Sequence, residues 1–157
     1  MYPEKVLQSS DYRVIYNAIN KEKFAYEPKV REIYRKHLNL QENFVVGYVG
    51  NFVYQKNIFY LIECAYELSN KIDQMKLMMV GDGPDLEKAK ELTKKLGIQE
   101  KVLFLGRRDD VSSLMQAMDC FILPSRFEGL PVVGIEAQAA GLKVFLSQNI
   151  SKETSLS

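Results

Sequence analysis

Short apolar runs alternate with longer segments of helical period along this 157-residue sequence. Strands that are apolar throughout are buried on both faces, and each run here is followed by a helix-like segment. The pattern therefore predicts a parallel sheet with helices on both faces. We expect an α/β, Rossmann-like doubly wound sheet of about six strands. The expected strands cover residues 13–16, 44–49, 76–80, 102–105, 120–123 and 143–145.

The segments between the strands carry apolar side chains at three- and four-residue steps, the spacing of one buried helix face. Such faces span residues 58–72 and 86–96, and Gly97 follows the second at the expected C-terminal stop. Residues 30–38 predict a basic amphipathic helix. Residues 132–140 are almost wholly apolar and predict a buried helix.

The charge balance argues against several classes of protein. Lysine and arginine number 21, aspartate and glutamate number 20, and the net charge is +1, so we expect no nucleic-acid partner. No charged-then-apolar leader opens the chain, and no apolar segment reaches the length of about 18 residues that spans a membrane. We expect no membrane span and a cytoplasmic location. We expect Cys64 and Cys120 to be buried free thiols. We expect His37, the single histidine, to lie at the surface.

Sheets of this kind bind ligands at the carboxyl ends of their strands, so the loops there are the candidate sites. In the loop at residues 50–57, Lys56 stands just before a helix, where its charge and free N–H groups suit phosphate oxygens. A solvated lysine at a helix start is the alternative. Gly81 and Gly83 form a tight strand-to-helix turn, which alone is weakly specific, and no third glycine completes a dinucleotide fingerprint.

Two further loops carry charge. Arg107 and Arg108 suit a base or a phosphate, although local ion pairs with the adjacent aspartates explain them as well. Glu128 and Glu136 stand eight positions apart, a little over two helical turns, so they could project toward the same cleft. A buried carboxylate is costly unless it is hydrogen-bonded or paired, so Glu136 suggests a ligand with hydroxyl groups. Two structural glutamates are the alternative.

These loops together resemble the donor site of family 4 (group 1) retaining glycosyltransferases of the GT-B fold. The family's central motif is similar to the arrangement of Glu128 and Glu136, which are separated by seven residues. Pro-Ser precedes this pair, and Ala-Gln-Ala-Ala-Gly-Leu follows it. Residues 50–57 resemble its Gly-Arg-Phe-x-x-Gln-Lys-Asn loop, and residues 81–84 its glycine turn. Residues 104–107 resemble the loop that flanks the base, and residues 14–20 the Asn-Gly-Ile-Asp segment where the second domain begins.

The resemblance implies a role for each loop. Glu136 holds the ribose hydroxyls, Glu128 faces the donor sugar as the catalytic residue, and Lys56 meets the diphosphate. The amides of Gly129 and Leu130 help to bind the diphosphate or the sugar. The implied nucleotide-sugar-binding residues are Asn51, Lys56, Gly81, Gly83, Arg107, Ser125, Gly129, Leu130 and Glu136. The substrate is a UDP- or GDP-sugar, and no cofactor and no metal are implied, because lysine, amides and a helix dipole stabilise the leaving group.

The resemblance also implies a longer enzyme. We expect residues 1–157 to be a single nucleotide-sugar-binding domain, without the acceptor domain and the final C-terminal helix. The acceptor, a glycan or lipid-linked sugar, then binds through the missing domain, and the whole enzyme acts in polysaccharide assembly at the inner face of the cell membrane. We expect the chain by itself to be inactive.

Two departures from the family pattern and two rival functions stay open. Asn51 occupies the usual position of an arginine, and Ala18 and Asn20 stand where glycine and aspartate are common. The rivals are a GT-B nucleotide-sugar 2-epimerase, for which His37 is the only candidate histidine, and a non-catalytic flavodoxin-like module.

Overall fold

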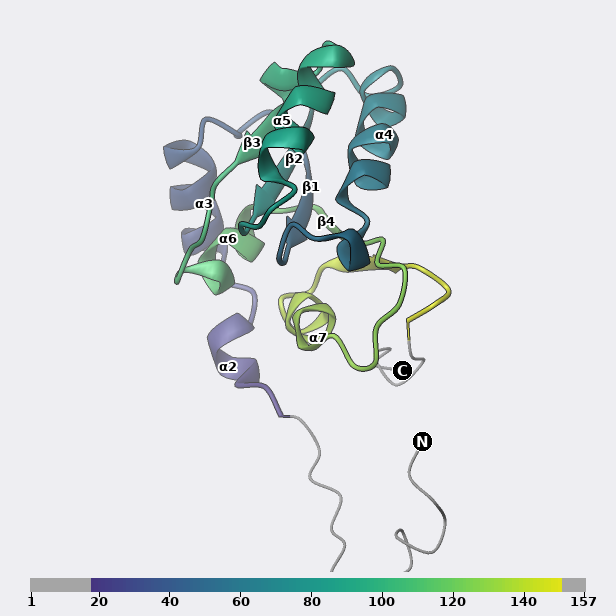
Figure 1. Ribbon diagram of the computed structural model, residues 1–157. Helices are drawn as coiled ribbons and strands as arrows, with labels where there is room; N and C mark the ends of the chain where they lie inside the picture. Colours follow the sequence, from purple (N-terminus) through teal and green to yellow (C-terminus); the bar gives the residue numbers. More distant parts are fainter. Residues whose placement is uncertain (1–17, 151–157) are drawn as a thin grey trace, which may run out of the picture.

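The computed structural model describes residues 18–150. Its centre is a parallel sheet of five strands in the order β3-β2-β1-β4-β5 (Figure 1). The strands are β1 (Phe44–Val49), β2 (Met75–Val80), β3 (Val102–Phe104), β4 (Cys120–Leu123) and β5 (Lys143–Leu146). The predicted Rossmann-like α/β fold is thereby confirmed. The remaining expected strand, at residues 13–16, lies outside the described residues.

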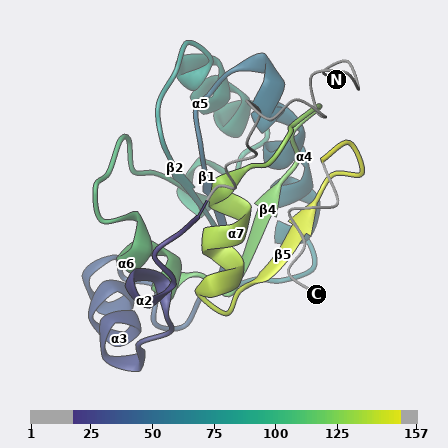
Figure 2. The same cartoon turned by 90° about the horizontal axis from the view of Figure 1, so that it is seen from below.

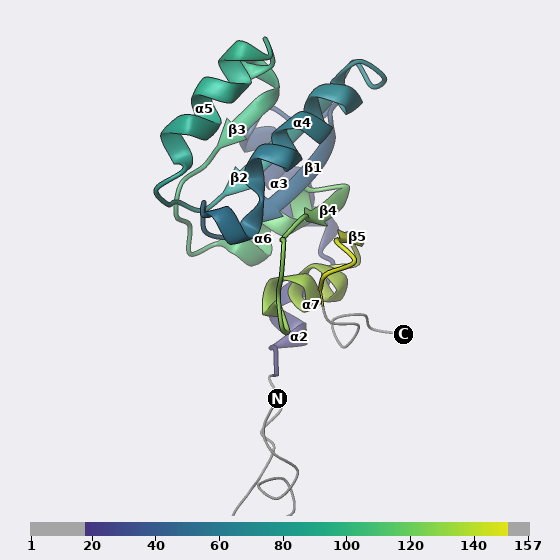
Figure 3. The same cartoon turned by 45° about the vertical axis from the view of Figure 1, so that its right-hand side comes forward.

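Helices lie on both faces of this sheet. In Figure 3, α4 (Ile58–Ser69) and α5 (Leu86–Lys95) cover one face, while α3 (Pro28–His37) and α6 (Val111–Ala117) pack together behind it. The short α2 (Lys21–Phe24) contacts α6 and α7 (Val132–Ala139). Single 3-10 turns, Tyr54–Lys56 and Gln99–Lys101, complete the elements.

The expected helices at residues 30–38, 58–72 and 86–96 are present, with ends that differ by a few residues. Pro28 begins α3 because proline is well suited to a first helical turn, where its missing N–H costs nothing. Gly97 follows α5 with a φ of +70°, as its predicted stop requires. The short helices α2 and α6 were not predicted, because neither is long enough to show a helical period.

The prediction that the helix after β4 is buried was only partly right. Within α7, Gly134 and Ala137 are buried, whereas Val133 and Ile135 are partly exposed. The helix packs against β4, β5 and α2, and these elements cover part of its circumference (Figure 2). His37 is exposed, as expected; of the two free cysteines, Cys120 is buried and Cys64 is only partly so.

The strand order determines where a ligand can reach the sheet. From β1 the chain winds outward through β2 to β3, then crosses back to β4, which pairs with the other side of β1. The chain therefore continues in opposite directions along the sheet after β1 and after β4. Parallel α/β sheets bind their ligands in the crevice at such a switch point.

Candidate functional site

The loops that follow β1 and β4 are bound to each other at the switch point. The backbone N–H of Arg126 donates to the carbonyl of Gln55 over 2.8 Å, and the Gln55 side chain donates to the carbonyl of Phe127 over 3.0 Å. Asn57 donates from its side-chain amide to the carbonyl of Pro124 over 3.2 Å. These bonds hold the two loops in one arrangement, although they are far apart in sequence.

An ion pair crosses the same gap. The Lys56 ammonium contacts Oε1 of Glu128, and the hydroxyl of Ser125 donates to that oxygen over 2.8 Å. The two charged side chains are 17% and 10% exposed, and Ser125 is fully buried. The expected diphosphate-binding lysine and the expected sugar-facing carboxylate thus lie in direct contact. A mostly desolvated pair of this kind is far less screened than a surface pair.

Tyr48, in β1, forms a hydrogen bond to the loop that follows this strand. Its hydroxyl donates to the carbonyl of Asn51 over 3.0 Å. Burial, together with the nearby charge of Glu128, raises the pKa of Tyr48 well above its usual value, so the phenol remains a donor at neutral pH. The Asn51 side chain is exposed, so the position at which the family usually has arginine faces solvent.

Glu136 lines a cavity of about 480 Å³ at the carboxyl ends of the strands. Its carboxylate is partly buried and makes no hydrogen bond or ion pair with the residues that the structure describes. Burial raises the pKa of Glu136, and the positive charge of Lys23 partly offsets that effect. Polar and charged residues and one glycine form part of the lining, namely Lys23, Gly50, Asn51, Lys56, Arg108, Asp109, Ser112 and Glu136.

Glu128 does not line this cavity. The sequence allowed both glutamates to project toward one cleft, but only Glu136 lines the cavity. Lys56 links the two positions, because it lines the same cavity as Glu136 and forms an ion pair with Glu128. Gly129 and Leu130 lie directly before Pro131, which caps the N-terminus of α7, and Gly129 is exposed.

Gly81 and Gly83 allow the loops after β1 and β2 to touch. A Cβ on Gly81 would lie 2.0 Å from the carbonyl oxygen of Gly50, and one on Gly83 would lie 2.4 Å from that of Phe52. Gly81 also lines a neighbouring cavity of about 370 Å³, together with Arg107. Gly83 lines neither of these cavities, so its contribution is the close backbone packing.

The two arginines before α6 differ. Arg108 forms an ion pair with Asp110, with nitrogen–oxygen distances of 2.6 and 2.8 Å, which is the local pairing that the sequence offered as an alternative. Arg107 is exposed and makes no ion pair with the described residues, so its guanidinium is available to a ligand at the smaller cavity.

Three residues at the site were not named from the sequence. Lys23 lines the cavity of Glu136 from α2, Tyr48 donates to the loop after β1, and Gln55 bonds the two loops. Gln55 stood within a recognised motif, but Lys23 lies in a helix too short for its facing side to be predicted. Within residues 18–150, no group of three or more His, Cys, Asp or Glu side chains is placed to hold a metal ion. No helix of that part is long and apolar enough to cross a membrane.

The fold and the arrangement of loops at its switch point define a domain of the GT-B glycosyltransferase type. Residues 30–153 match the family of glycosyl transferases group 1, and the chain belongs to that family. It is 35% identical over 138 residues to UDP-Gal:alpha-D-GlcNAc-diphosphoundecaprenol alpha-1,3-galactosyltransferase of Escherichia coli, covering 85% of this chain and 36% of that protein. It is also 35% identical over 112 residues to the Bacillus subtilis glycosyltransferase EpsF, covering 71% of this chain and 29% of that protein.

A solved structure shares both the fold and part of the sequence. The Anabaena protein HepE in complex with UDP superposes with a TM-score of 0.83 and is 26% identical, over 92% of this chain and 41% of that one. HepE has also been solved with UDP-glucose. This chain thus spans about a third of the length of the two relatives named above.

Proposed function

We propose that this chain is the donor-binding domain of a metal-independent, retaining glycosyltransferase. The enzyme transfers a sugar from a UDP- or GDP-sugar to a glycan or lipid-linked acceptor, which an N-terminal domain outside this sequence binds. The E. coli relative is named for a diphosphoundecaprenol-linked acceptor, and HepE binds UDP and UDP-glucose; both support the proposal.

One observation carries the assignment of the nucleotide site. Glu136 is a partly buried carboxylate without a hydrogen-bond partner among the described residues, and it lines a cavity at the switch point. Leaving such a group unpaired costs free energy, which the vicinal hydroxyls of a ribose recover by donating to both carboxylate oxygens. Ribose binding is therefore the role we assign to Glu136.

The diphosphate lies, in this proposal, beside Lys56. The lysine then has two anionic partners, the leaving diphosphate in the cavity and Glu128 across the loops. The N–H groups of Gly129 and Leu130 and the dipole of α7 add to the stabilisation of the leaving group, so the reaction needs no metal cation. Glu128 faces the sugar, and it contacts Lys56 without lining the cavity.

The rival functions find less support. A 2-epimerase would call for a histidine close to the donor, and His37 lines neither cavity. The family match and the UDP complexes of HepE favour a nucleotide-sugar domain over a flavodoxin-like module.

Calorimetric titration of the chain with uridine, guanosine and adenosine diphosphates tests the proposal. We expect binding of one diphosphate, and a ten- to hundredfold loss in Glu136→Ala, about 1.5–3 kcal/mol. Glu128→Ala is the comparison variant, since it removes a carboxylate that pairs with Lys56 and does not line the cavity, and we expect it to change diphosphate affinity less than Glu136→Ala does. Equal losses in both variants for the free diphosphate would show that the roles are wrongly assigned.

A further inference from the structure

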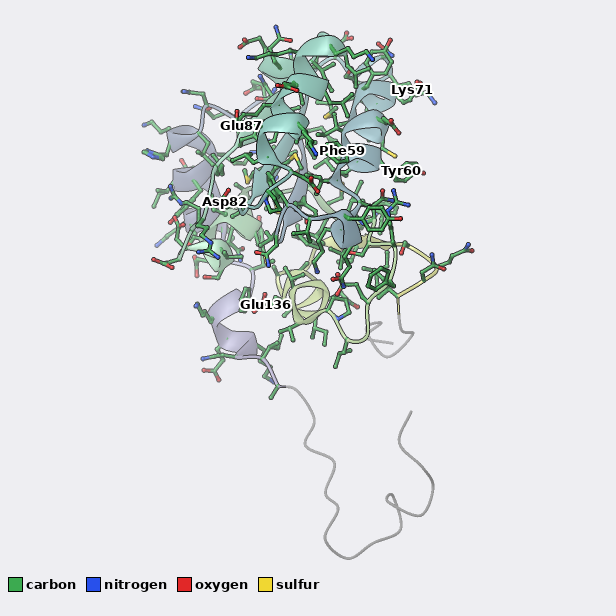
Figure 4. All side chains as sticks on the ribbon, viewed as in Figure 1. Phe59, Tyr60, Lys71, Asp82, Glu87 and Glu136 are labelled. Carbon is green, nitrogen blue, oxygen red and sulfur yellow. The ribbon has the colours of Figure 1, made fainter. Side chains whose placement is uncertain are left out.

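Lys23 and Glu136 come from different elements and line the same cavity of about 480 Å³. Lys23 belongs to α2 and Glu136 to α7, and these two helices contact each other (Figures 1 and 2). Figure 4 shows Glu136 on the side of α7 that lies toward α2. The buried ring of Phe24, the last residue of α2, anchors the helix next to the cavity.

The other cations of the cavity are already paired. Lys56 contacts Glu128, and Arg108 contacts Asp110. Lys23 forms no ion pair with any residue in the described range 18–150.

Few other charges face Glu136. Asp109, in the loop before α6, is the other acidic residue of the cavity lining. On α2, Lys21 and Glu22 are exposed and do not line the cavity. Helix α7 carries no second charged residue, and Lys143 of β5 lines a different cavity beside α4. Lys23, whose ammonium lies 5.9 Å from the centroid of the Phe24 ring, is therefore the cation of the cavity lining that has no ion-pair partner among the described residues.

We propose that Lys23 is a positioning residue that keeps Glu136 ionised and held at the cavity, ready to accept hydrogen bonds from both hydroxyls of the donor ribose. The inference rests on the proposed function, because it requires Glu136 to bind ribose. Lys23 acts through Glu136 and does not touch the donor. The opposing effects on the pKa of Glu136 agree with this role: burial raises it, and Lys23 lowers it.

The role predicts a specific dependence on pH. A neutral Glu136 cannot accept two charge-assisted hydrogen bonds, so donor affinity falls as pH drops through the pKa of Glu136. Removing Lys23 raises that pKa further and moves the acid limb of the binding curve to higher pH. We therefore expect the affinity of Lys23→Ala relative to the parent to fall by about two- to threefold as the pH drops from 7.5 to 5.

The probe is UDP-glucose, because both of its phosphates stay singly ionised across this pH range. We would titrate the parent chain, Lys23→Ala and Lys23→Arg by calorimetry from pH 5 to 8. Lys21→Ala is the matched control, since it removes the same charge from the same helix away from the cavity. Carbon-detected NMR of the Glu136 carboxyl in the absence of UDP-glucose reports its pKa directly. Thermal unfolding confirms that each variant is folded.

We expect Lys23→Ala to raise the Glu136 pKa and shift the acid limb, with Lys23→Arg and Lys21→Ala close to the parent. An equal loss of affinity at every pH would overturn the inference, because Lys23 would then contact the donor itself. A shift of the acid limb of the same size in Lys21→Ala would overturn the inference too, because the effect would then come from the net charge of α2 and not from the position of Lys23. If Glu136→Gln leaves UDP-glucose affinity unchanged, the proposed function fails. If Glu136→Gln weakens binding while Lys23→Ala changes neither pKa nor affinity, only the role of Lys23 fails.

Discussion

The ammonium of Lys56 and the carboxylate of Glu128 form an ion pair between residues 72 positions apart, across the switch point between β1 and β4. Ser125 donates to the same carboxylate and is itself fully buried. Each partner fixes the other without a ligand, so the site that we propose for the donor is arranged before any ligand binds. Preorganised charge lowers the cost of stabilising a leaving diphosphate.

Lys56→Ala should affect the affinity for a nucleoside diphosphate and leave the affinity for the nucleoside nearly unchanged. We expect nucleoside affinity to change little and diphosphate affinity to fall by roughly 1–3 kcal/mol, because only the diphosphate meets the lysine. Titrations with uridine and UDP measure both, and added salt should narrow the difference between parent and variant. Equal weakening of the two ligands would mean that Lys56 maintains the loop through Glu128 and does not touch phosphate.

Glu128→Gln should weaken the binding of a nucleotide-sugar more than the binding of a free diphosphate. The substitution keeps the size of the side chain and an acceptor oxygen for Ser125, while removing the charge. We expect UDP-glucose to bind about three- to tenfold more weakly and UDP to change by less than about threefold. Competition binding of the two ligands on the same preparation measures the ratio, and an unchanged ratio would contradict a sugar-facing Glu128.

Asn51→Arg should tighten diphosphate binding. The side chain is exposed and lines both cavities, and the contact with Tyr48 uses the backbone carbonyl, so an arginine can be accommodated there. We expect a gain of about three- to tenfold for UDP, which decreases with salt, and none for uridine. Asn51→Gln is the control for side-chain length without charge. Equal gains in the two variants would exclude a charge effect.

Asp119 should dominate the stability of the contact between α3 and the sheet. Burial by itself would raise the pKa of Asp119, but hydrogen bonds from the N–H of Val45 and from Arg31 and the charge of Arg35 outweigh it, so the pKa is lowered. Asp119→Ala leaves the buried Arg35 without its carboxylate. We expect a loss of roughly 2–3 kcal/mol in urea unfolding at pH 7.

The same lowered pKa sets the pH dependence of that stabilisation. It is present above the unfolded-state pKa of about 4 and is lost as pH falls through the folded pKa. The difference in stability between parent and Asp119→Ala should therefore shrink in acid. Glu87→Ala, which breaks an exposed pair with Lys90, is the control and should cost less than about 0.5 kcal/mol. A comparable cost for both would contradict the buried role of Asp119.

Gly81→Ala should be far more damaging than Gly97→Ala. Both glycines have positive φ, +134° and +70°, but only at Gly81 does a Cβ meet backbone, at 2.0 Å from the Gly50 oxygen. We expect Gly97→Ala to cost about 1–2 kcal/mol of stability, and Gly81→Ala roughly 3 kcal/mol or more, because the loops after β1 and β2 must separate. Urea unfolding of the two variants measures the difference, and similar costs would show that the loops can adjust.

The sequence by itself determined the class of fold and the position of the loops. Strands that are apolar on both faces indicate a sheet covered by helices on both sides, and the helical period between them indicates crossover connections. The edge strand β5 departs from this pattern, because Lys143 and Phe145 are exposed. The end of α5 followed from Gly97, because only glycine adopts a positive φ there at little cost. These features are local, so a single segment suffices to predict each one.

The tertiary structure alone decided which side chains meet. The strand order places β1 next to β4, and this neighbourhood brings Lys56 into contact with Glu128. Glu136 lines a separate cavity, and Lys23 forms part of the same lining. Arg35 is buried although α3 reads as a basic surface helix, because Asp119 and backbone carbonyls from distant segments satisfy its guanidinium. Periodicity records whether a residue faces the core, whereas the choice of partner depends on contacts between segments that the fold alone brings together.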